Sequence, residues 1–432
     1  MNVRIKPLGG GRLRADRPVS IPSSKSHTIR ALLIAALAEG ESRLENPLDS
    51  ADARSCIDAC RALGAEIDTG AEPGLWRVRG NGGRFPERIP SIDVGNSGTT
   101  LYLAAAVSAL AGSPAAFTGD EQIRRRPAAA LLQSLADLGA DVDIRGEGGS
   151  APFSVCGPLR GGRTSIECPT SQYLSALLMS CPLADGESVI EVPLLMEKPY
   201  VEMTLRWLSQ QGISLSRNEA MSRFVIPGGQ RYIAFDGAIP GDFSSAAFPL
   251  CAAAVTGSSL RLSGLDVTDS QGDKAVIDYL GKMGCRFECG TDSVEIDAPP
   301  RLSAGRFDLN ATPDALPAMA VAACFAEGES DLGNVPQARL KETDRISVMR
   351  QELSKMGADI SEKEDGLLIR GGRPLQGAML DGHGDHRVVM SLSVAALKAG
   401  GECVISGAEA VDITYPGFFG ELEKLGAEVE LF

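Results

Sequence analysis

A sequence repeat runs through the whole chain of 432 residues and constrains its fold more than any other feature. The tripeptide Leu-Gly-Ala, or a close variant, followed by an alternating strand pattern, occurs six times, with successive glycines 75, 73, 72, 73 and 69 residues apart. These glycines are Gly64, Gly139, Gly212, Gly284, Gly357 and Gly426. A second series of glycines, which end Ala-rich apolar runs, is spaced by 72, 74, 71, 71 and 72 residues. Its members are Gly40, Gly112, Gly186, Gly257, Gly328 and Gly400. Such regularity indicates six copies of one structural unit.

Each copy predicts the same order of elements. A polar turn leads into an apolar helix ended by glycine, then a strand, an amphipathic helix, the Leu-Gly-Ala turn and another strand. The apolar helices are hydrophobic on nearly every face, so we expect them to be buried and the copies to share cores. We therefore expect an α/β (α+β) fold of two domains with three repeats each. A joint near residues 235–245 and a crossing near residues 18–22 predict the domains as 21–240 and as 1–20 plus 241–432. The segment 1–10 is expected to supply a strand to the last repeat.

Composition limits the classes of partner. The formal net charge of −14 and the pI near 4.9 argue against binding to nucleic acid or to an anionic membrane surface, both of which need a basic surface. The ten cysteines show no CxxC or Cys/His spacing, and only three histidines are present, so we expect no metal site. With no signal peptide and no long apolar span in the sequence, a reduced cytoplasmic protein is the natural expectation.

The segment before each apolar helix is polar and differs from copy to copy. The six segments are "PSSKSHTIR", "GNSGTTLY", "PTSQYLS", "GDFSSAAF", "TPDALPAM" and "GDHRVVM". Helix capping accounts for Ser, Thr, Asn and Asp there, but not for Lys25, Arg30, Gln172 or Arg387. Cations at helix N-termini oppose the helix dipole, whereas a bound anion would be stabilised by both. The pattern therefore predicts an anionic ligand carrying phosphate, carboxylate or both.

Two further basic stretches fit the same purpose. "GDEQIRRRP" contains Arg124, Arg125 and Arg126, two of which are expected to be solvated surface charges. "ARLKETDR" contains Arg339, Lys341, Glu342, Asp344 and Arg345. On its own, this second stretch is equally compatible with salt bridges along one helix.

Taken together, these motifs resemble the enolpyruvyl transferase family. The segments "PSSKSHTIRALLIAALA", "GNSGTTLYLAAA", "RRRP", "PTSQYLSALLM", "EKPYVEMT", "PDALPAMAVAA", "RLKETDR" and "GDHRVVM" follow the order and spacing of that family over essentially the whole chain. The resemblance implies two domains, each built from three βαβαββ units, around a central cleft. It is closest to the members that transfer the enolpyruvyl group of phosphoenolpyruvate to the 5-hydroxyl of shikimate 3-phosphate and release phosphate. This reaction belongs to the shikimate pathway of aromatic amino-acid biosynthesis, and the resemblance implies a monomer without metal or cofactor.

The resemblance also implies the site residues. At shikimate 3-phosphate it places Lys25, Ser26, Arg30, Thr170, Ser171, Gln172, Tyr200, Asp314, Gln337 and Lys341. At phosphoenolpyruvate it places Lys25, Asn96, Gly98, Thr99, Arg126, Gln172, Arg345, Asp385 and Arg387. Of these, Lys25 would contact both substrates and Asp314 would be the base, although Asp314 is also a candidate helix N-cap. Glu342 would be the acid that protonates the methylene carbon.

Five positions depart from the family pattern and leave alternatives open. They are Ile413 in place of a lysine, Glu197 in place of a serine, Tyr102 in place of an arginine, and the milder changes Gln337 and Thr170. A carboxylate about 4 Å from a phosphate would cost a few kcal/mol at intermediate dielectric, so Glu197 leaves the acceptor open to question. One alternative is an enolpyruvyl transferase acting on another alcohol. The sugar-nucleotide version usually carries a loop cysteine, whereas no cysteine lies between Cys60 and Cys156. The other is a non-catalytic relative that binds an anionic metabolite.

Overall fold

The computed structural model describes residues 1–9 and 11–432, and Gly10, in the expected N-terminal strand segment, lies outside them. The chain divides into two compact units. We call Met1–Ser24 together with Pro240–Phe432 unit 1, and Lys25–Ile239 unit 2. Among the described residues, none of the helices has the length and apolar character needed to cross a membrane.

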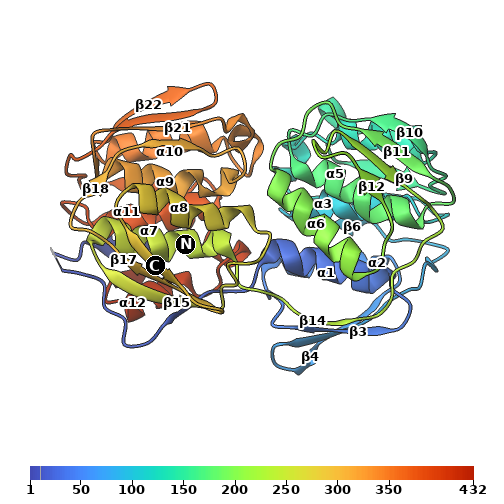
Figure 1. Cartoon of the computed structure of the whole chain (residues 1–432), viewed down its shortest axis with the longest axis horizontal. Coiled ribbons are helices and arrows are strands. Elements are labelled where there is room, and N and C mark those ends of the chain that lie inside the picture. The colour runs from blue at the N-terminus through green and yellow to red at the C-terminus, as the bar shows by residue number, and fades with distance from the viewer. Residues whose placement is uncertain (10) are drawn as a thin grey trace. The chain divides into compact units, whose positions relative to one another are not determined.

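Unit 2 contains six principal helices among its described elements (blue to green in Figure 1). In chain order its elements are α1 (Lys25–Leu37), β3 (Glu41–Glu45), α2 (Ala51–Ala62), β4 (Glu66–Glu72), β5 (Leu75–Arg79), β6 (Ile92–Asp93), α3 (Gly98–Ser108), β7 (Ala115–Thr118), α4 (Ala129–Asp137), β8 (Asp141–Ile144), β9 (Phe153–Cys156), β10 (Gly162–Ser165), α5 (Ser171–Ser180), β11 (Ser188–Glu191), α6 (Lys198–Gln210), β12 (Ser216–Arg217), β13 (Arg223–Ile226) and β14 (Asp236–Ala238).

Unit 1 has a similar succession of helices and strands, with two additional short strands. Its elements are β1 (Asn2–Lys6), β2 (Val19–Ser20), α7 (Phe243–Thr256), β15 (Ser259–Ser263), α8 (Val276–Lys282), β16 (Arg286–Cys289), β17 (Ser293–Asp297), β18 (Leu302–Ser303), β19 (Arg306–Asp308), α9 (Leu316–Cys324), β20 (Ala326–Glu327), β21 (Glu329–Gly333), α10 (Arg345–Lys355), β22 (Asp359–Lys363), β23 (Gly366–Arg370), β24 (Met379–Asp381), α11 (His386–Ala396), β25 (Cys403–Ser406), α12 (Phe418–Lys424) and β26 (Glu428–Leu431). The two additional strands are β18 and β20.

The strands form small mixed sheets with one shared pairing pattern. Within the described residues six sheets have four strands, in the orders β14-β3-β5-β4, β6-β7-β9-β8, β10-β11-β13-β12, β2-β15-β17-β16, β19-β21-β23-β22 and β24-β25-β1-β26. In each of them the first pair is parallel and the other two pairs are antiparallel. The N-terminal strand β1 takes the third position of the last sheet, with Val3 opposite Ile405 and Leu431. The residue pattern alone predicted two strands per copy, and each sheet has four.

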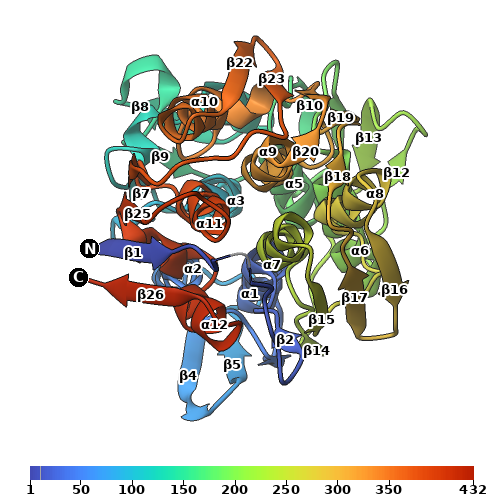
Figure 2. The same cartoon turned by 90° about the vertical axis from the view of Figure 1, so that its left-hand side faces the viewer.

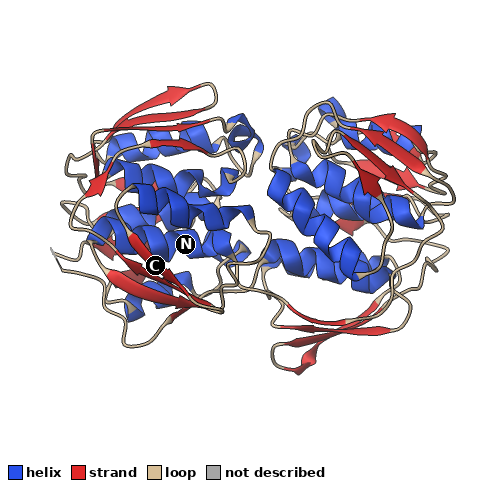
Figure 3. Cartoon of the chain, viewed as in Figure 1, coloured by secondary structure: helices blue, strands red, loops and turns tan. Residues whose placement is uncertain are grey.

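The prediction that the apolar helices are buried is confirmed. Every residue of α3 is buried, and so are all residues of α1 from His27 to Leu37. In unit 1, α7, α9 and α11 pack against one another and are seen nearly end on in Figure 2. Within each unit the helices lie inside and the sheets lie on the outer side (Figure 3). A helix without a polar face is stable only in such an interior position.

The Leu-Gly-Ala turns end the amphipathic helices in one common way. At the first of them, Gly64 has φ +100°, which disfavours a residue with a Cβ, and Ala65 N–H donates to Cys60 O at 3.0 Å. This is the 6→1 hydrogen bond of a Schellman motif, which satisfies a carbonyl that the helix end leaves free. The same 6→1 bond and a positive φ recur at Gly139, Gly212, Gly284, Gly357 and Gly426. The repeat in the sequence is therefore a repeat of helix ends.

Candidate active site

The N-terminus of α1 carries a lysine that is paired within the chain. Lys25 Nζ lies 3.0 Å from Asp52 Oδ2 of α2, and the two side chains are 13% and 6% exposed. Arg30, one turn further along α1, is buried and donates to Thr204 Oγ1, to Ser175 Oγ and to two backbone carbonyls. Burial lowers the pKa of Arg30 to about 10. Arg30 therefore lies inside the helix packing of unit 2, where it joins α1 to α5 and α6.

The N-termini of α3 and α5 meet through a side-chain hydrogen bond. Gln172 Nε2 in α5 donates to Thr99 Oγ1 in α3 at 2.9 Å, and Thr170 caps α5 by accepting the Gln172 N–H. The guanidinium of Arg126 lies so close to Gly98 that a Cβ on that glycine would overlap Arg126 Nη1. An arginine thus lies at the positive end of α3, the position that the sequence predicted for an anion-binding group.

The loop that carries Arg126 is held by buried polar side chains. Tyr102 and Tyr173 both donate to the carbonyl of Pro127, at 2.9 and 2.5 Å, and their rings form an edge-to-face pair. Burial raises the pKa of Tyr102 to about 12, so it remains a neutral donor. On the other side of the loop, Asn96 Nδ2 donates to Asp120 and Gln122.

Only one arginine of the "RRRP" run is buried. Arg126 is 9% exposed, whereas Arg124 and Arg125 are exposed and Arg125 pairs with Glu121. The prediction that two of these three arginines are solvated is confirmed.

Unit 1 brings together six charged groups around the start of α10. Arg345 is fully buried, and its guanidinium donates to Asp314 Oδ1 at 2.6 Å, to Glu342 Oε2 at 2.6 Å and to Asp385 Oδ2 at 2.7 Å. Arg387 Nη2 lies 3.2 Å from Asp314 Oδ2. The positive field of Lys341 also acts on Asp314. We call these three carboxylates and three cations the Arg345 cluster; its formal charges balance.

The Arg345 cluster keeps Asp314 and Asp385 ionised. Burial acts to raise the pKa of Asp314, but Arg387, Lys341 and Arg345 outweigh it and hold that pKa well below the usual range. Burial likewise opposes ionisation of Asp385, and Arg345 more than compensates, so its pKa is also lowered. Asp385 additionally caps α11 by accepting the Arg387 N–H at 2.9 Å. Asp314 lies in a short 3-10 helix (Pro313–Ala315), and the N-cap position of α9 is Ala315.

The structure adds partners that the sequence did not indicate. Asp52 pairs with Lys25, and Thr343 Oγ1 donates to Asp385 at 3.2 Å. Gln337 is buried and donates to Asn310 O, while Ile413 packs against the hydrophobic core of unit 1. A carboxylate two residues after a helix N-cap, as Asp52 is after Ser50, is too common a pattern to have singled it out.

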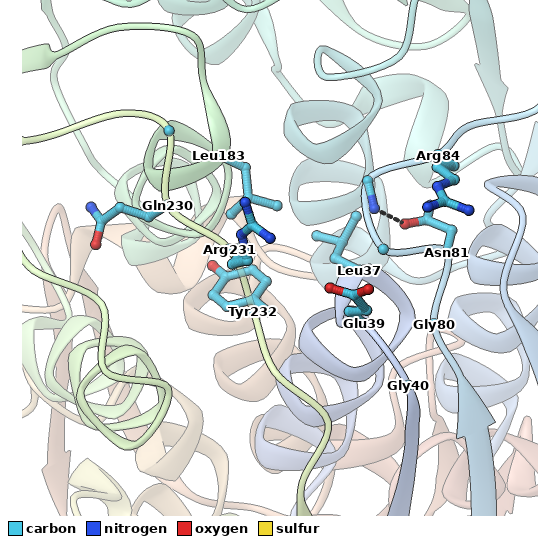
Figure 4. A pocket seen from close by; sticks show the side chains of 13 residues that line it. Leu37, Glu39, Gly40, Gly80, Asn81, Arg84, Leu183, Gln230, Arg231 and Tyr232 are labelled. Carbon is cyan, nitrogen blue, oxygen red and sulfur yellow. Dashed lines mark hydrogen bonds between the residues drawn. The ribbon is translucent and has the colours of Figure 1, made fainter.

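One cavity of unit 2 lies away from the predicted residues. It measures about 450 Å³ and lies at the C-terminal end of α1, where Leu37 and Glu39 face Arg84, Arg231 and Tyr232 (Figure 4). Helix α1 has 13 residues and is therefore roughly 20 Å long, which separates this cavity from Lys25. None of the residues predicted for the site lines it.

Comparison with known proteins decides the family. The model of the EPSP synthase (3-phosphoshikimate 1-carboxyvinyltransferase) family matches residues 9–422. The chain belongs to the EPSP synthase family. It is 49% identical over 413 residues to a 3-phosphoshikimate 1-carboxyvinyltransferase of Ruminiclostridium cellulolyticum and 51% identical over 418 residues to one of Acetivibrio thermocellus. Each match covers 96% of this chain and 97% of the relative.

A solved structure supports the same family. The EPSP synthase of Acinetobacter baumannii superposes with a TM-score of 0.83 at 27% identity, and both chains are covered completely. The mixed α/β fold of small sheets and helices described above is therefore the fold of a known EPSP synthase.

Proposed function

We infer that the chain catalyses the reaction of the EPSP synthases. The carboxyvinyl (enolpyruvyl) group of phosphoenolpyruvate is transferred to the 5-hydroxyl of shikimate 3-phosphate, and inorganic phosphate is released, in the shikimate pathway. The observation that supports this function most strongly is the similarity to two 3-phosphoshikimate 1-carboxyvinyltransferases, which are 49% and 51% identical to this chain over 96% of its length. Both substrates are anions with phosphate and carboxylate groups, which suits helix N-termini flanked by lysine and arginine.

In our proposal each unit contributes half of the site. Unit 2 offers Lys25 and the ends of α3 and α5, with Gln172 hydrogen-bonded to Thr99 and Arg126 against Gly98. Unit 1 offers the Arg345 cluster. The six similar sheets support a further proposal, that the chain is built of six βαβαββ repeats in two three-repeat domains. We also propose a monomeric cytoplasmic enzyme.

The proposed proton transfers involve two carboxylates of the Arg345 cluster. Asp314 is the base for the 5-hydroxyl, and Glu342 is the acid for the methylene carbon. Without substrate, the surrounding cations hold the pKa of Asp314 well below its usual range, which makes it a weak base. Anionic substrates that engage Arg387 and Lys341 would weaken this field and raise the basicity of Asp314. The arginine forks would then stabilise the charge of the tetrahedral phosphate-bearing adduct.

Phosphate release tests the proposed function directly. We expect the purified chain to release inorganic phosphate when it is given phosphoenolpyruvate and shikimate 3-phosphate together, and not when either is given alone. A coupled phosphate assay measures this. Release only with another alcohol would assign a different acceptor, and tight binding of both substrates without release would indicate a non-catalytic relative.

Gly98 offers a test of the role of Arg126. A Cβ at position 98 would overlap Arg126 Nη1 and lie 3.3 Å from its Cζ. Because the obstacle is the flexible end of a side chain, Gly98→Ala should displace the guanidinium without unfolding unit 2. We expect the KM for phosphoenolpyruvate to rise by ~10 to 10²-fold, since small misplacements of a substrate-positioning group have effects of that size.

The matched control is Gly112→Ala, which follows α3 and has no atom within 4 Å of the added Cβ. Steady-state kinetics should show no change in that variant, and thermal melting should show both variants folded. An unchanged KM for phosphoenolpyruvate in Gly98→Ala would mean that Arg126 does not bind this substrate.

A further inference from the structure

A carboxylate of the chain itself occupies the hydrogen-bond donors at the N-terminus of α5. Glu197 Oε2 accepts the backbone N–H of Ser171 at 3.1 Å, the Ser171 hydroxyl at 2.8 Å and the Thr170 hydroxyl at 3.5 Å. Its side chain is only 2% exposed. Two hydroxyls and a free helix N–H form a site suited to an anion, and in this structure the anion is Glu197.

The backbone directs Glu197 to this position. Leu194 O accepts the Cys168 N–H at 2.8 Å and Cys168 O accepts the Met196 N–H at 3.1 Å, so the two segments run side by side just before Thr170 and Glu197. Glu197 itself has φ 57° and ψ 40°, in the left-handed region that a residue with a Cβ rarely adopts. Backbone of this kind is retained where the surrounding structure holds it, often at functional sites.

Other buried helices have an in-chain carboxylate at the same end. Asp52 pairs with Lys25 at α1, Asp120 accepts from Asn96 just before α3, and Asp273 accepts from Ser244 at α7. At α7 and α11 the capping carboxylates Asp242 and Asp385 accept a backbone N–H of the helix that they directly precede, whereas Glu197 reaches the α5 N–H from a separate segment of the chain. It therefore binds the donors that an incoming anion would use.

We propose that Glu197 is a displaceable internal ligand of the Thr170–Ser171 donors and competes with the phosphate of the acceptor. The proposal rests on the proposed function, which assigns Thr170 and Ser171 to shikimate 3-phosphate. Two anions cannot share the same three donors, and at about 4 Å their charges repel. The carboxylate must leave when the phosphate binds, so Glu197 determines how tightly a phosphorylated acceptor is held.

Binding of two ligands that differ only in the phosphate tests the proposal. Calorimetry on the full chain compares shikimate 3-phosphate with shikimate for wild type, Glu197→Gln and Glu197→Ser. Gln keeps the size of the side chain and removes its charge. Ser removes the charge and also leaves the Thr170–Ser171 donors without the Glu197 side chain as acceptor. We expect the Kd of shikimate 3-phosphate to fall at least tenfold in Glu197→Gln, and further in Glu197→Ser, with shikimate unchanged. In kinetics, the KM for shikimate 3-phosphate should fall while that for phosphoenolpyruvate stays the same.

The control is Glu202→Gln in the same helix, α6. Glu202 pairs with Arg217 at 3.0 Å at a partly exposed site, so the variant removes one negative charge without touching the α5 donors. It should bind both ligands as the wild type does.

The outcomes separate this proposal from the proposed function. Unchanged or weaker binding of shikimate 3-phosphate in Glu197→Gln, or equal tightening for shikimate, overturns the competition. Wild type that releases no phosphate overturns the proposed activity. Phosphate-specific tightening in the Glu197 variants would uphold the competition even then.

Discussion

Replacing Lys25 by Met together with Asp52 by Asn should abolish turnover and leave the fold intact. Lys25 is proposed to contact both substrates, so its loss removes a cation from each binding step and from the transition state. We expect kcat/KM to fall by ~10³-fold, the upper range for removal of one electrostatic group from an active site. The coupled phosphate assay measures the loss, and circular dichroism with thermal melting measures the fold.

The double variant is needed because of Asp52. The two charges lie 3.0 Å apart and are largely buried, so Lys25→Met alone would leave an unpaired buried carboxylate. Breaking a buried ion pair in this way costs ~3 to 5 kcal/mol, whereas neutralising both partners costs much less. Lys282→Met, at an exposed position of α8, is the control for the loss of one lysine. If Lys25→Met/Asp52→Asn kept activity within tenfold of wild type, Lys25 would not be a site residue.

The contrast between Lys25 and Asp52 shows what the sequence could predict. Lys25 stands out because a cation at the start of an apolar helix conflicts with the helix dipole. The sequence then suggested that such a cation makes sense only when an anion arrives. In the structure, in-chain carboxylates already meet Lys25, Arg345 and Arg387. Asp52 lies in the first turn of α2, and nothing in the surrounding sequence marks it as the partner of Lys25.

The fold followed most directly from periodic features. Each Leu-Gly-Ala turn contains a local hydrogen bond whose geometry favours glycine. The glycine therefore recurs in the sequence at a regular spacing. Burial of helices such as α3 followed because they have no polar face. The extra strands were missed: β6 has two residues, and β5 is the second arm of a hairpin whose pairing depends on neighbours.

Positions that depart from the family pattern could be named but not explained from sequence. Tyr102 proves to be one of two phenols that hold the Pro127 carbonyl, and its partner Tyr173 comes from another helix. Such a pair depends on tertiary packing of α3 against α5, which no spacing along the chain reports.

Replacing Arg345 by Met should be the most destabilising single change in the Arg345 cluster. This side chain bonds to all three carboxylates, Asp314, Glu342 and Asp385, so its loss leaves three carboxylates against two cations in a largely buried place. We expect unit 1 to lose ~3 to 5 kcal/mol of unfolding free energy, and turnover to be lost with it. Arg350→Met in the same helix, whose partner Glu362 is at 3.3 Å on the partly exposed surface, should cost under ~1 kcal/mol.

The loss of stability in Arg345→Met should depend on pH. The pKa values of Asp314 and Asp385 are lowered in the folded chain, so their stabilisation is complete above the usual Asp value near 3.8 and is lost as pH falls below it. In Arg345→Met, Asp385 loses its main cationic partner and Asp314 loses one of three, so acid then removes repulsion between the carboxylates instead of attraction to Arg345. The difference in denaturant midpoint between wild type and Arg345→Met should therefore be largest near neutral pH and shrink below pH 4. A difference that stays constant through this range would mean that Arg345 stabilises unit 1 by packing and not by charge.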